Sequence, residues 1–173
     1  MRFFAVALVL GLATPTQAEV VDVAANGMEI KQVVRIAATP EKLWAALIQP
    51  AKWWSSDHTF SGASENITFD PKIGGCWCET MPNGGGVEHM RVTHMRPPAM
   101  LVTRGSLGPF FNLAADGTLT FSLSASGAET ELTLTFRAGG YVKEGFQKWA
   151  PAVDGVLAQQ TGNLKKFAEA AAK

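Results

Sequence analysis

The sequence predicts an α+β fold in which a seven-stranded antiparallel sheet is covered by one long C-terminal helix. Between residues 146 and 171, mostly apolar residues recur at steps of three and four, which places them on one stripe of an α-helix. Upstream, runs of alternating apolar and polar residues follow one another across tight turns, as in antiparallel sheets. The helices are few and segregated from the strands, so the class is α+β.

The first predicted strand covers residues 28–36, where apolar residues alternate with Glu29, Lys31 and Arg35. Two short helices follow, the first opened by a capping threonine and a first-turn proline at 39–40 and ending at Gln49. Six more strands are predicted, over residues 66–70, 76–81, 87–95, 100–107, 118–124 and 130–137. A helical turn over 144–149 leads to the long helix, which is expected to begin near Ala150 because Pro151 suits a first turn.

The N-terminus has the pattern of a secretory signal. Arg2 precedes an apolar run over residues 3–12, and a small residue, Ala18, closes the segment. The run is too short to serve as a permanent membrane anchor. The sequence therefore predicts a signal peptide over residues 1–18, cleavage after Ala18, one domain over residues 19–173, and a periplasmic or secreted protein.

Composition excludes several classes of partner. The chain has 15 basic and 15 acidic residues and a formal net charge of zero, without basic runs. Such a balance argues against nucleic acid and against an electrostatically held membrane surface. We expect no cofactor and no membrane anchor, and the sequence names neither a partner protein nor an oligomeric state.

Several segments together resemble a known superfamily. They are Thr-Pro-Glu-Lys-Leu-Trp-Ala-Ala-Leu at 39–47, the tryptophan pair at 53–54, Pro-Lys-Ile-Gly-Gly at 71–75, the proline pair at 97–98, and Thr-Glu-Leu-Thr-Leu at 130–134 before the last helix. The chain resembles the SRPBCC or START-like superfamily over residues 28–171. Within it, the branch of activator-of-heat-shock-ATPase homologues and polyketide-cyclase-like proteins is the most similar.

The resemblance implies a helix-grip fold, in which a curved antiparallel sheet wraps around the C-terminal helix and leaves an apolar cavity between them. It also implies a small-molecule ligand, since members bind lipids, hormones or aromatic natural products, and some are cyclases, dehydratases or hydrolases. No single catalytic set is shared. An exported chain meets no ATP, so we do not expect it to activate a cytosolic ATPase.

Cys76 and Cys78 are the two cysteines, and they stand in a predicted strand. Residues two apart in a regular strand lie about 6.5–7 Å apart, beyond comfortable disulfide reach. Two buried free thiols are therefore the favoured interpretation. The alternatives are a disulfide made possible by a bulge at Gly74-Gly75, or a metal site completed by His89 or His94. The sequence assigns no metal ligand.

The strand over residues 87–95 carries His89 and Arg91 on one face and Met90 and Val92 on the other. The apolar pair is expected to face inward, which leaves His89 and Arg91 outside. The alternative is an enzyme in which Glu79, His89 and Arg91 lie in the cavity as acid–base and orienting groups. His58 is a weaker candidate, because its neighbour Asp57 diverges from it.

Large aromatic residues supply most of the expected binding surface. Phe110 and Phe111 share one loop, so at least one of them is expected to line the cavity entrance. The predicted ligand-binding residues are Trp44, Trp54, Phe60, Glu79, Met90, Phe110, Phe111 and Trp149. The leading hypothesis is an exported binding protein for a small apolar or aromatic molecule; the rivals are the enzyme, and a metal or redox protein centred on Cys76 and Cys78.

Overall fold

A computed structural model describes residues 17–172, with only the backbone of residues 17 and 18. Most of the predicted signal peptide thus lies outside the described residues. The strands are β1 Gln17–Val23, β2 Gly27–Ile36, β3 Ile67–Phe69, β4 Cys76–Thr80, β5 Gly86–Arg96, β6 Met100–Gly105, β7 Ala115–Ser126 and β8 Glu129–Gly140. The α-helices are α1 Pro40–Leu47 and α2 Ala150–Ala171. Short 3₁₀ turns are η1 Pro50–Lys52, η2 Ser56–His58, η3 Ser64–Asn66, η4 Pro82–Gly84, η5 Gly108–Asn112 and η6 Phe146–Lys148.

All described strands form one antiparallel sheet in the order β1-β2-β8-β7-β6-β5-β4-β3. The sheet has eight strands instead of the predicted seven, because residues 17–23, for which no strand was predicted, pair with β2 as the edge strand β1. The run Glu-Val-Val-Asp-Val at 19–23 does not alternate between apolar and polar residues, which hid this strand from the alternation pattern. The α+β class, the antiparallel sheet and the long terminal helix are confirmed.

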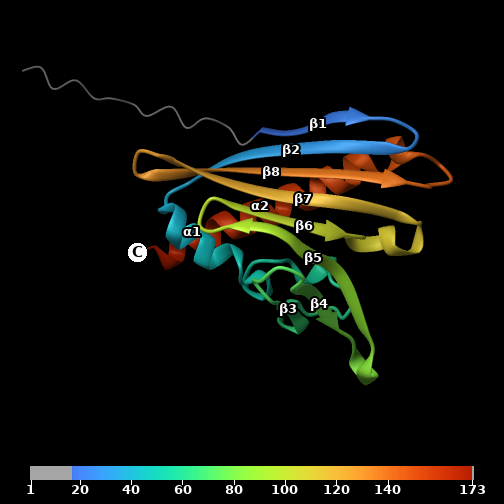
Figure 1. Cartoon of the computed structure of the whole chain (residues 1–173), viewed down its shortest axis with the longest axis horizontal. Helices are drawn as coiled ribbons and strands as arrows, with labels where there is room; N and C mark the ends of the chain where they lie inside the picture. Colours follow the sequence, from blue (N-terminus) through green and yellow to red (C-terminus); the bar gives the residue numbers. More distant parts are fainter. Residues whose placement is uncertain (1–16, 173) are drawn as a thin grey trace, which may run out of the picture.

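The long helix lies across one face of the sheet (Figure 1), where it packs on β2 and β1, and α1 packs against it. It begins at Ala150 as predicted, with Pro151 in its first turn. Gln160 and Leu164 of the predicted stripe are buried, whereas Val153, Val156 and Phe167 of that stripe are only half-buried. The other buried residues of the helix are Ala150, Leu157, Thr161 and Ala168.

The sheet is curved by irregularities in β5. The pairing register shifts between Trp77 and Cys78 of β4, and again between Val92 and His94 of β5. Bulges bend a strand and increase its twist, and Figure 1 shows β5 turning away from the direction of β6, with β4 and β3 carried below the rest of the sheet. This bend separates the β3–β5 end from α2 and leaves room for a cavity.

Candidate functional site

A cavity of about 270 Å³ lies between α2 and the concave side of the sheet. Its wall combines residues from the sheet, from α2 and from two loops. The lining residues are Trp54, His58, Thr59, Phe60, Ile67, Trp77, His89, Leu107, Gly108, Pro109, Phe110, Phe136, Trp149, Ala152, Val153, Val156 and Leu157. Within residues 17–172, no lysine, arginine, aspartate or glutamate is among them. The lining is therefore mostly aromatic and aliphatic, and its polar groups are two imidazoles, one hydroxyl and the indole N–H groups of three tryptophans.

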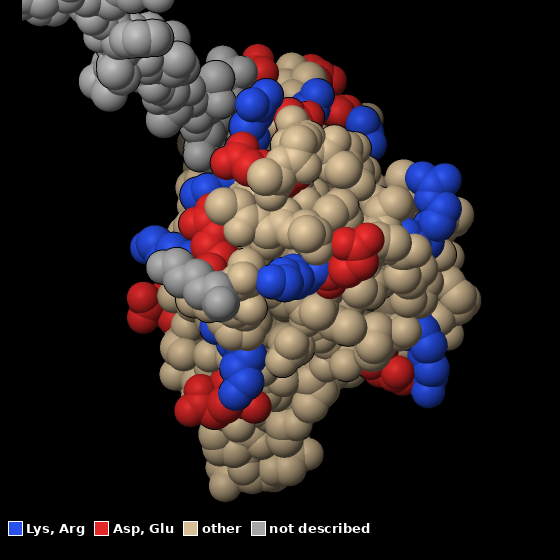
Figure 2. Space-filling model, turned by 90° about the vertical axis from the view of Figure 1, so that its left-hand side faces the viewer, with Lys and Arg blue, Asp and Glu red and all other residues tan. Residues whose placement is uncertain are grey.

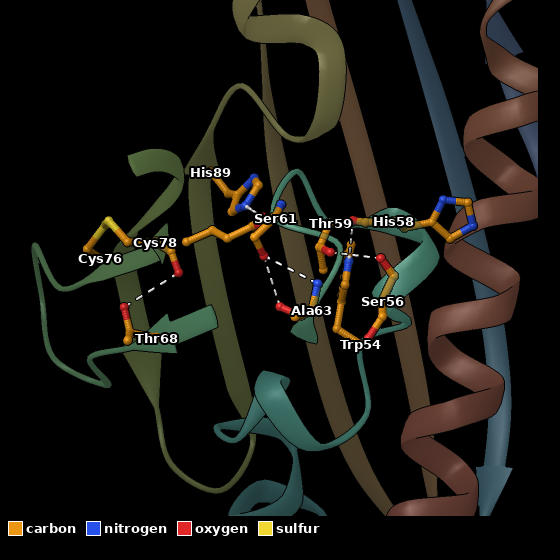
Figure 3. Close-up of polar contacts among 11 residues, drawn as sticks. Trp54, Ser56, His58, Thr59, Ser61, Ala63, Thr68, Cys76, Cys78 and His89 are labelled. Carbon is orange, nitrogen blue, oxygen red and sulfur yellow. Dashed lines mark hydrogen bonds and ion pairs between the residues drawn. A yellow bond between two sulfur atoms is a disulfide. The ribbon is translucent and has the colours of Figure 1, made fainter. Parts of the chain in front are cut away.

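The loop after η1 covers one side of the cavity and is fastened at both ends. Near its start, the backbone N–H of Ser55 donates to Oε1 of Gln160 at 2.8 Å, and His58 Nε2 lies 2.9 Å from Gln159 Oε1, so α2 holds this end. Near its finish, the backbone N–H of Ser61 donates to Oε1 of Glu79 on β4. Figure 3 shows His58 reaching toward the helix and Ser61 close to His89. The loop is thus placed over the cavity by polar contacts, while its aromatic side chains face inward.

The second loop contains η5, and the side chains of its two adjacent phenylalanines point in different directions. Phe110 is buried, lines the cavity and contacts the ring of Trp149 at a centroid distance of 5.7 Å. Phe111 points outward with 44 % of its surface exposed, and its ring meets Phe60 edge-on at 5.3 Å. Phe60, itself 41 % exposed, lines the cavity. These two exposed rings join the two loops at the cavity's edge.

His89 faces the interior, contrary to the prediction that it lies outside. Trp77 pairs with Met90 and Cys78 pairs with Glu88, so His89 is the extra residue of a β-bulge. A bulge breaks the two-residue alternation, so His89 and Met90 are both buried although they are adjacent. Gly105 on β6 makes room for it, since a Cβ there would lie 2.5 Å from the carbonyl oxygen of His89.

Inside the bulge, His89 meets a buried carboxylate. Its Nε2 lies 3.0 Å from Oε2 of Glu79, and both side chains are almost fully buried. Burial raises the pKa of Glu79, but hydrogen bonds from Ser61, from the Phe60 backbone and from His89 outweigh it, so the net pKa lies below the usual value of 4.5. Glu79 is therefore an ionised acceptor at neutral pH. The other ring nitrogen of His89, Nδ1, is buried and has no hydrogen-bond partner among the described residues.

Arg91 does not join this pair. Its side chain is exposed on the outer face, where Nε donates to Oε1 of Glu88 at 2.8 Å and Nη1 donates to the Gly74 carbonyl at 2.9 Å. The strand resumes its alternation after the bulge, so Arg91 points away from Met90. The predicted triad of Glu79, His89 and Arg91 is reduced to its first two members.

The prediction of two free thiols is wrong: Cys76 and Cys78 form a disulfide. Their Cα atoms are 5.4 Å apart, closer than in a regular strand, which brings the sulfurs within bonding reach. The tight turn before the strand requires Gly75, where a Cβ would lie 1.9 Å from the Asp70 carbonyl oxygen. Figure 3 shows the disulfide on the side of the strands away from α2.

The residues of the alternative metal site, the two cysteines and His89, do not lie together. His89 lies on the inner face of the sheet, whereas the half-buried cysteines lie on the outer face with Glu88 as their nearest additional ligand group. Disulfide sulfurs are not thiolates, and thiolates are the form of cysteine that binds metals. In this oxidised state the cysteines therefore form a covalent cross-link within β4.

Four predicted ligand-binding residues line the cavity, namely Trp54, Phe60, Phe110 and Trp149. The other four do not. Trp44 is half-buried on α1, Met90 is packed within the sheet, Phe111 is exposed, and Glu79 lies behind His89.

Sequence reasoning missed the contributions of Ile67, Trp77, Leu107, Val153 and Val156 to the lining. Val153 and Val156 lay on the predicted apolar stripe, but nothing in that pattern showed that they face a void.

Charge is spread thinly over the molecule. Figure 2 shows blue and red side chains interspersed on one face, with an uncharged lower lobe at the β4–β5 end. No helix within the described part of the chain combines the length and the hydropathy that crossing a bilayer requires.

A family model called Activator of Hsp90 ATPase homolog 1-like protein matches residues 37–169. The chain belongs to this family. The match covers α1, all but the last two residues of α2, strands β3–β8 and the whole cavity lining. No curated protein matches the chain.

Solved structures share the fold at low sequence identity. A Rhodobacter sphaeroides protein has 23% identity, a TM-score of 0.56, and covers 89% of this chain and 99% of its own. A Mesorhizobium loti protein has 23% identity, a TM-score of 0.55, and covers 79% and 95%. CalU16 from Micromonospora echinospora has 12% identity, a TM-score of 0.51, and covers 92% and 94%. These likenesses show the fold, and the family match confirms the superfamily predicted from the sequence.

Proposed function

We propose that this protein is an exported binding protein that holds a small, largely apolar or aromatic molecule in the cavity between α2 and the sheet. The observation that carries the proposal is the 270 Å³ void with an aromatic and aliphatic lining. An apolar cavity of about 150 Å³ is enough to bind benzene. The ligand is therefore expected to be about the size of two fused rings.

The wall of the cavity supports this assignment because α2 contributes apolar side chains to it. Val153 and Val156 on α2 face the void and are only half-buried, while Leu157 and Leu164 on the same helix are completely buried. Apolar pockets with a few placed polar groups are the usual form of small-molecule sites.

The proposal is tested by filling the void. Val156→Trp places an indole in the cavity, and Lys166→Trp adds the same group at an exposed position of the same helix. Titration with naphthalene, followed by tryptophan fluorescence, is expected to show saturable binding in the wild type and in Lys166→Trp, and none in Val156→Trp. Equal binding by all three proteins would contradict the cavity as the site.

Export is the second part of the proposal, and it rests on the residues before β1. Cleavage after Ala18 leaves all of β1 except its first two residues. Native mass spectrometry of protein taken from its own source tests this part, since the mature chain is expected to begin at Glu19. The same spectrum reports the mass of any retained ligand. An intact Met1 in the mature protein would refute export.

A second candidate function is favoured by the Glu79–His89 pair. A carboxylate-backed imidazole is a common general base, so an enzyme of the cyclase, dehydratase or hydrolase type is the alternative, now without Arg91. A His89→Gln variant distinguishes the two candidates. An enzyme is expected to retain a species of different mass from the one retained by the wild type, whereas a binding protein retains the same species or none.

A further inference from the structure

We infer that the ligand is a neutral aromatic molecule carrying a hydroxyl group, and that His89 Nδ1 accepts a hydrogen bond from this hydroxyl while Glu79 positions the ring. This inference rests on the proposed function and deepens it. It assigns a hydrogen-bond polarity to a site whose lining is otherwise apolar.

The polarity follows from the partners of Glu79. Both carboxylate oxygens accept hydrogen bonds, Oε1 from the Ser61 backbone N–H and Oε2 from His89. An ionised carboxylate has no proton to give. In the neutral imidazole, His89 must therefore carry its proton on Nε2, and Nδ1 is left with a lone pair. The carboxylate fixes the tautomer of the histidine, as buried second partners commonly do.

The unpaired state of Nδ1 indicates that a partner is missing. Buried polar atoms in folded proteins are almost always hydrogen-bonded. Only two buried side-chain nitrogens in the described part of the chain lack a partner, His89 Nδ1 and Gln160 Nε2, and Gln160 does not line the cavity. Other polar atoms of the lining have partners, since His58 Nε2 contacts Gln159, the Thr59 hydroxyl donates to the Ser56 carbonyl and Trp54 Nε1 donates to the His58 carbonyl.

The rest of the lining defines the class of ligand. Phe60 stacks on the His89 ring at 5.9 Å with 21° between the planes, and the remaining walls carry several more aromatic rings. Flat molecules suit such walls. An anionic ligand does not, because no lysine or arginine within residues 17–172 lines the cavity and a carboxylate would face the lone pair of Nδ1.

The test compares 1-naphthol with 1-methylnaphthalene, in which a methyl group replaces the hydroxyl. At pH 8, we expect the wild type to bind 1-naphthol about tenfold more tightly than 1-methylnaphthalene, the effect of one net hydrogen bond. His89→Phe keeps an aromatic ring but removes both nitrogens. We expect this variant to lose the preference and to retain its affinity for 1-methylnaphthalene.

Glu79→Gln examines the role of the carboxylate. A carboxamide can accept from Ser61 with its oxygen and donate to His89 Nε2 with its nitrogen, which moves the histidine proton to Nδ1. The variant is expected to prefer 1-naphthaldehyde, which only accepts, over 1-naphthol. A merely structural role for Glu79 would weaken both ligands alike, and that result would overturn the assigned polarity.

The possible outcomes distinguish this inference from the proposed binding function on which it rests. Equal wild-type affinity for 1-naphthol and 1-methylnaphthalene, with both abolished by Val156→Trp, would overturn the hydroxyl assignment and leave the binding function standing. Binding of neither ligand by the wild type would overturn both.

Discussion

Buried polar groups are hydrogen-bonded to different extents in the two halves of the sheet, β1-β2-β8-β7 and β6-β5-β4-β3. Between β2 and α2, Gln32 is buried and fully bonded: Nε2 donates to the Asp154 carbonyl and to its Oδ1, each at 3.0 Å, and Oε1 accepts from Thr161 at 3.0 Å. In the β3–β5 half, buried His89 leaves one nitrogen without a partner within the described chain. A completed network stabilises the fold, whereas an incomplete one beside a cavity is a place for a ligand.

Regularity follows the same division. The β2–β8 and β7–β8 pairings run without a shift, and buried residues alternate strictly along most of β8. The other half contains both shifts in β5, several 3₁₀ turns and the disulfide, whereas the regular half has one shift, at its edge, between Val20 and Asp22 of β1. The regular half is therefore expected to carry most of the stability, and the irregular half most of the binding.

The largest effect is expected from Leu164→Ala on α2. Leu164 is completely buried, so its truncation is expected to lower the free energy of unfolding by about 2–5 kcal/mol in urea denaturation. Leu107→Ala is the matched control in the other half. Leu107 already borders the cavity, so its loss is expected to be less than half as large. Equal losses would contradict the division of stability.

A smaller and pH-dependent effect is expected from Glu79→Ala. Removing this carboxylate leaves two donors unpaired and is expected to cost about 1–3 kcal/mol at pH 7. Because folding lowers the pKa of Glu79, its contribution is complete above the usual value of 4.5 and is lost as the pH falls toward the folded pKa. The stability difference between wild type and variant should therefore narrow at acidic pH, as measured by urea denaturation from pH 7 to pH 3.

Glu88→Ala is the control for that pH series, since Glu88 is exposed on the outer face. Its effect is expected to stay within about 0.5 kcal/mol. A Glu79→Ala difference that stays constant down to pH 3 would show that the carboxylate is not held ionised by the fold.

The disulfide is expected to contribute about 1–2 kcal/mol, because it closes a very short loop. Replacing both Cys76 and Cys78 with alanine removes it. Hydrogen exchange is then expected to speed up in β4 and β5 while β7 and β8 keep their protection. Two titratable thiols in unfolded, unreduced wild-type protein would show that the bond is absent.

The smallest effect on stability is expected from Phe60→Ala, under about 1 kcal/mol, because much of this ring is exposed. Its contact with Phe111 closes the edge of the cavity, so we expect ligand dissociation to become faster in stopped-flow measurements. Tyr141→Ala removes a ring that is 72 % exposed and does not line the cavity, and it should leave the rate unchanged. Equal ligand dissociation rates in all three proteins would show that the contact between Phe60 and Phe111 does not close the cavity.

The sequence predicted the regular half well. The predicted strands over 28–36 and 130–137 lie within β2 and β8, and the long helix begins at the predicted residue. These elements repeat their pattern over many residues, so local periodicity specifies them. β1 was missed because it is a short edge strand with a weak apolar pattern.

The cavity was harder to predict, and His89 shows why. Strict alternation makes residues 89 and 90 point to opposite faces, but one extra residue in the pairing turns both inward. Nothing in the run Val-Glu-His-Met-Arg marks that residue. The disulfide was misjudged for the same reason, since regular strand geometry was assumed where the strand is irregular.

The bulge also bears on how this fold acquires new specificity. Pairing is intact on both sides of His89, at Glu88 and at Met90. Inserting or deleting one codon at this position would therefore exchange the chemistry of the interior while the neighbouring strands keep their partners. Related proteins with this sheet can in this way have either an entirely apolar cavity or a cavity with a hydrogen-bond acceptor, while the rest of the fold stays the same.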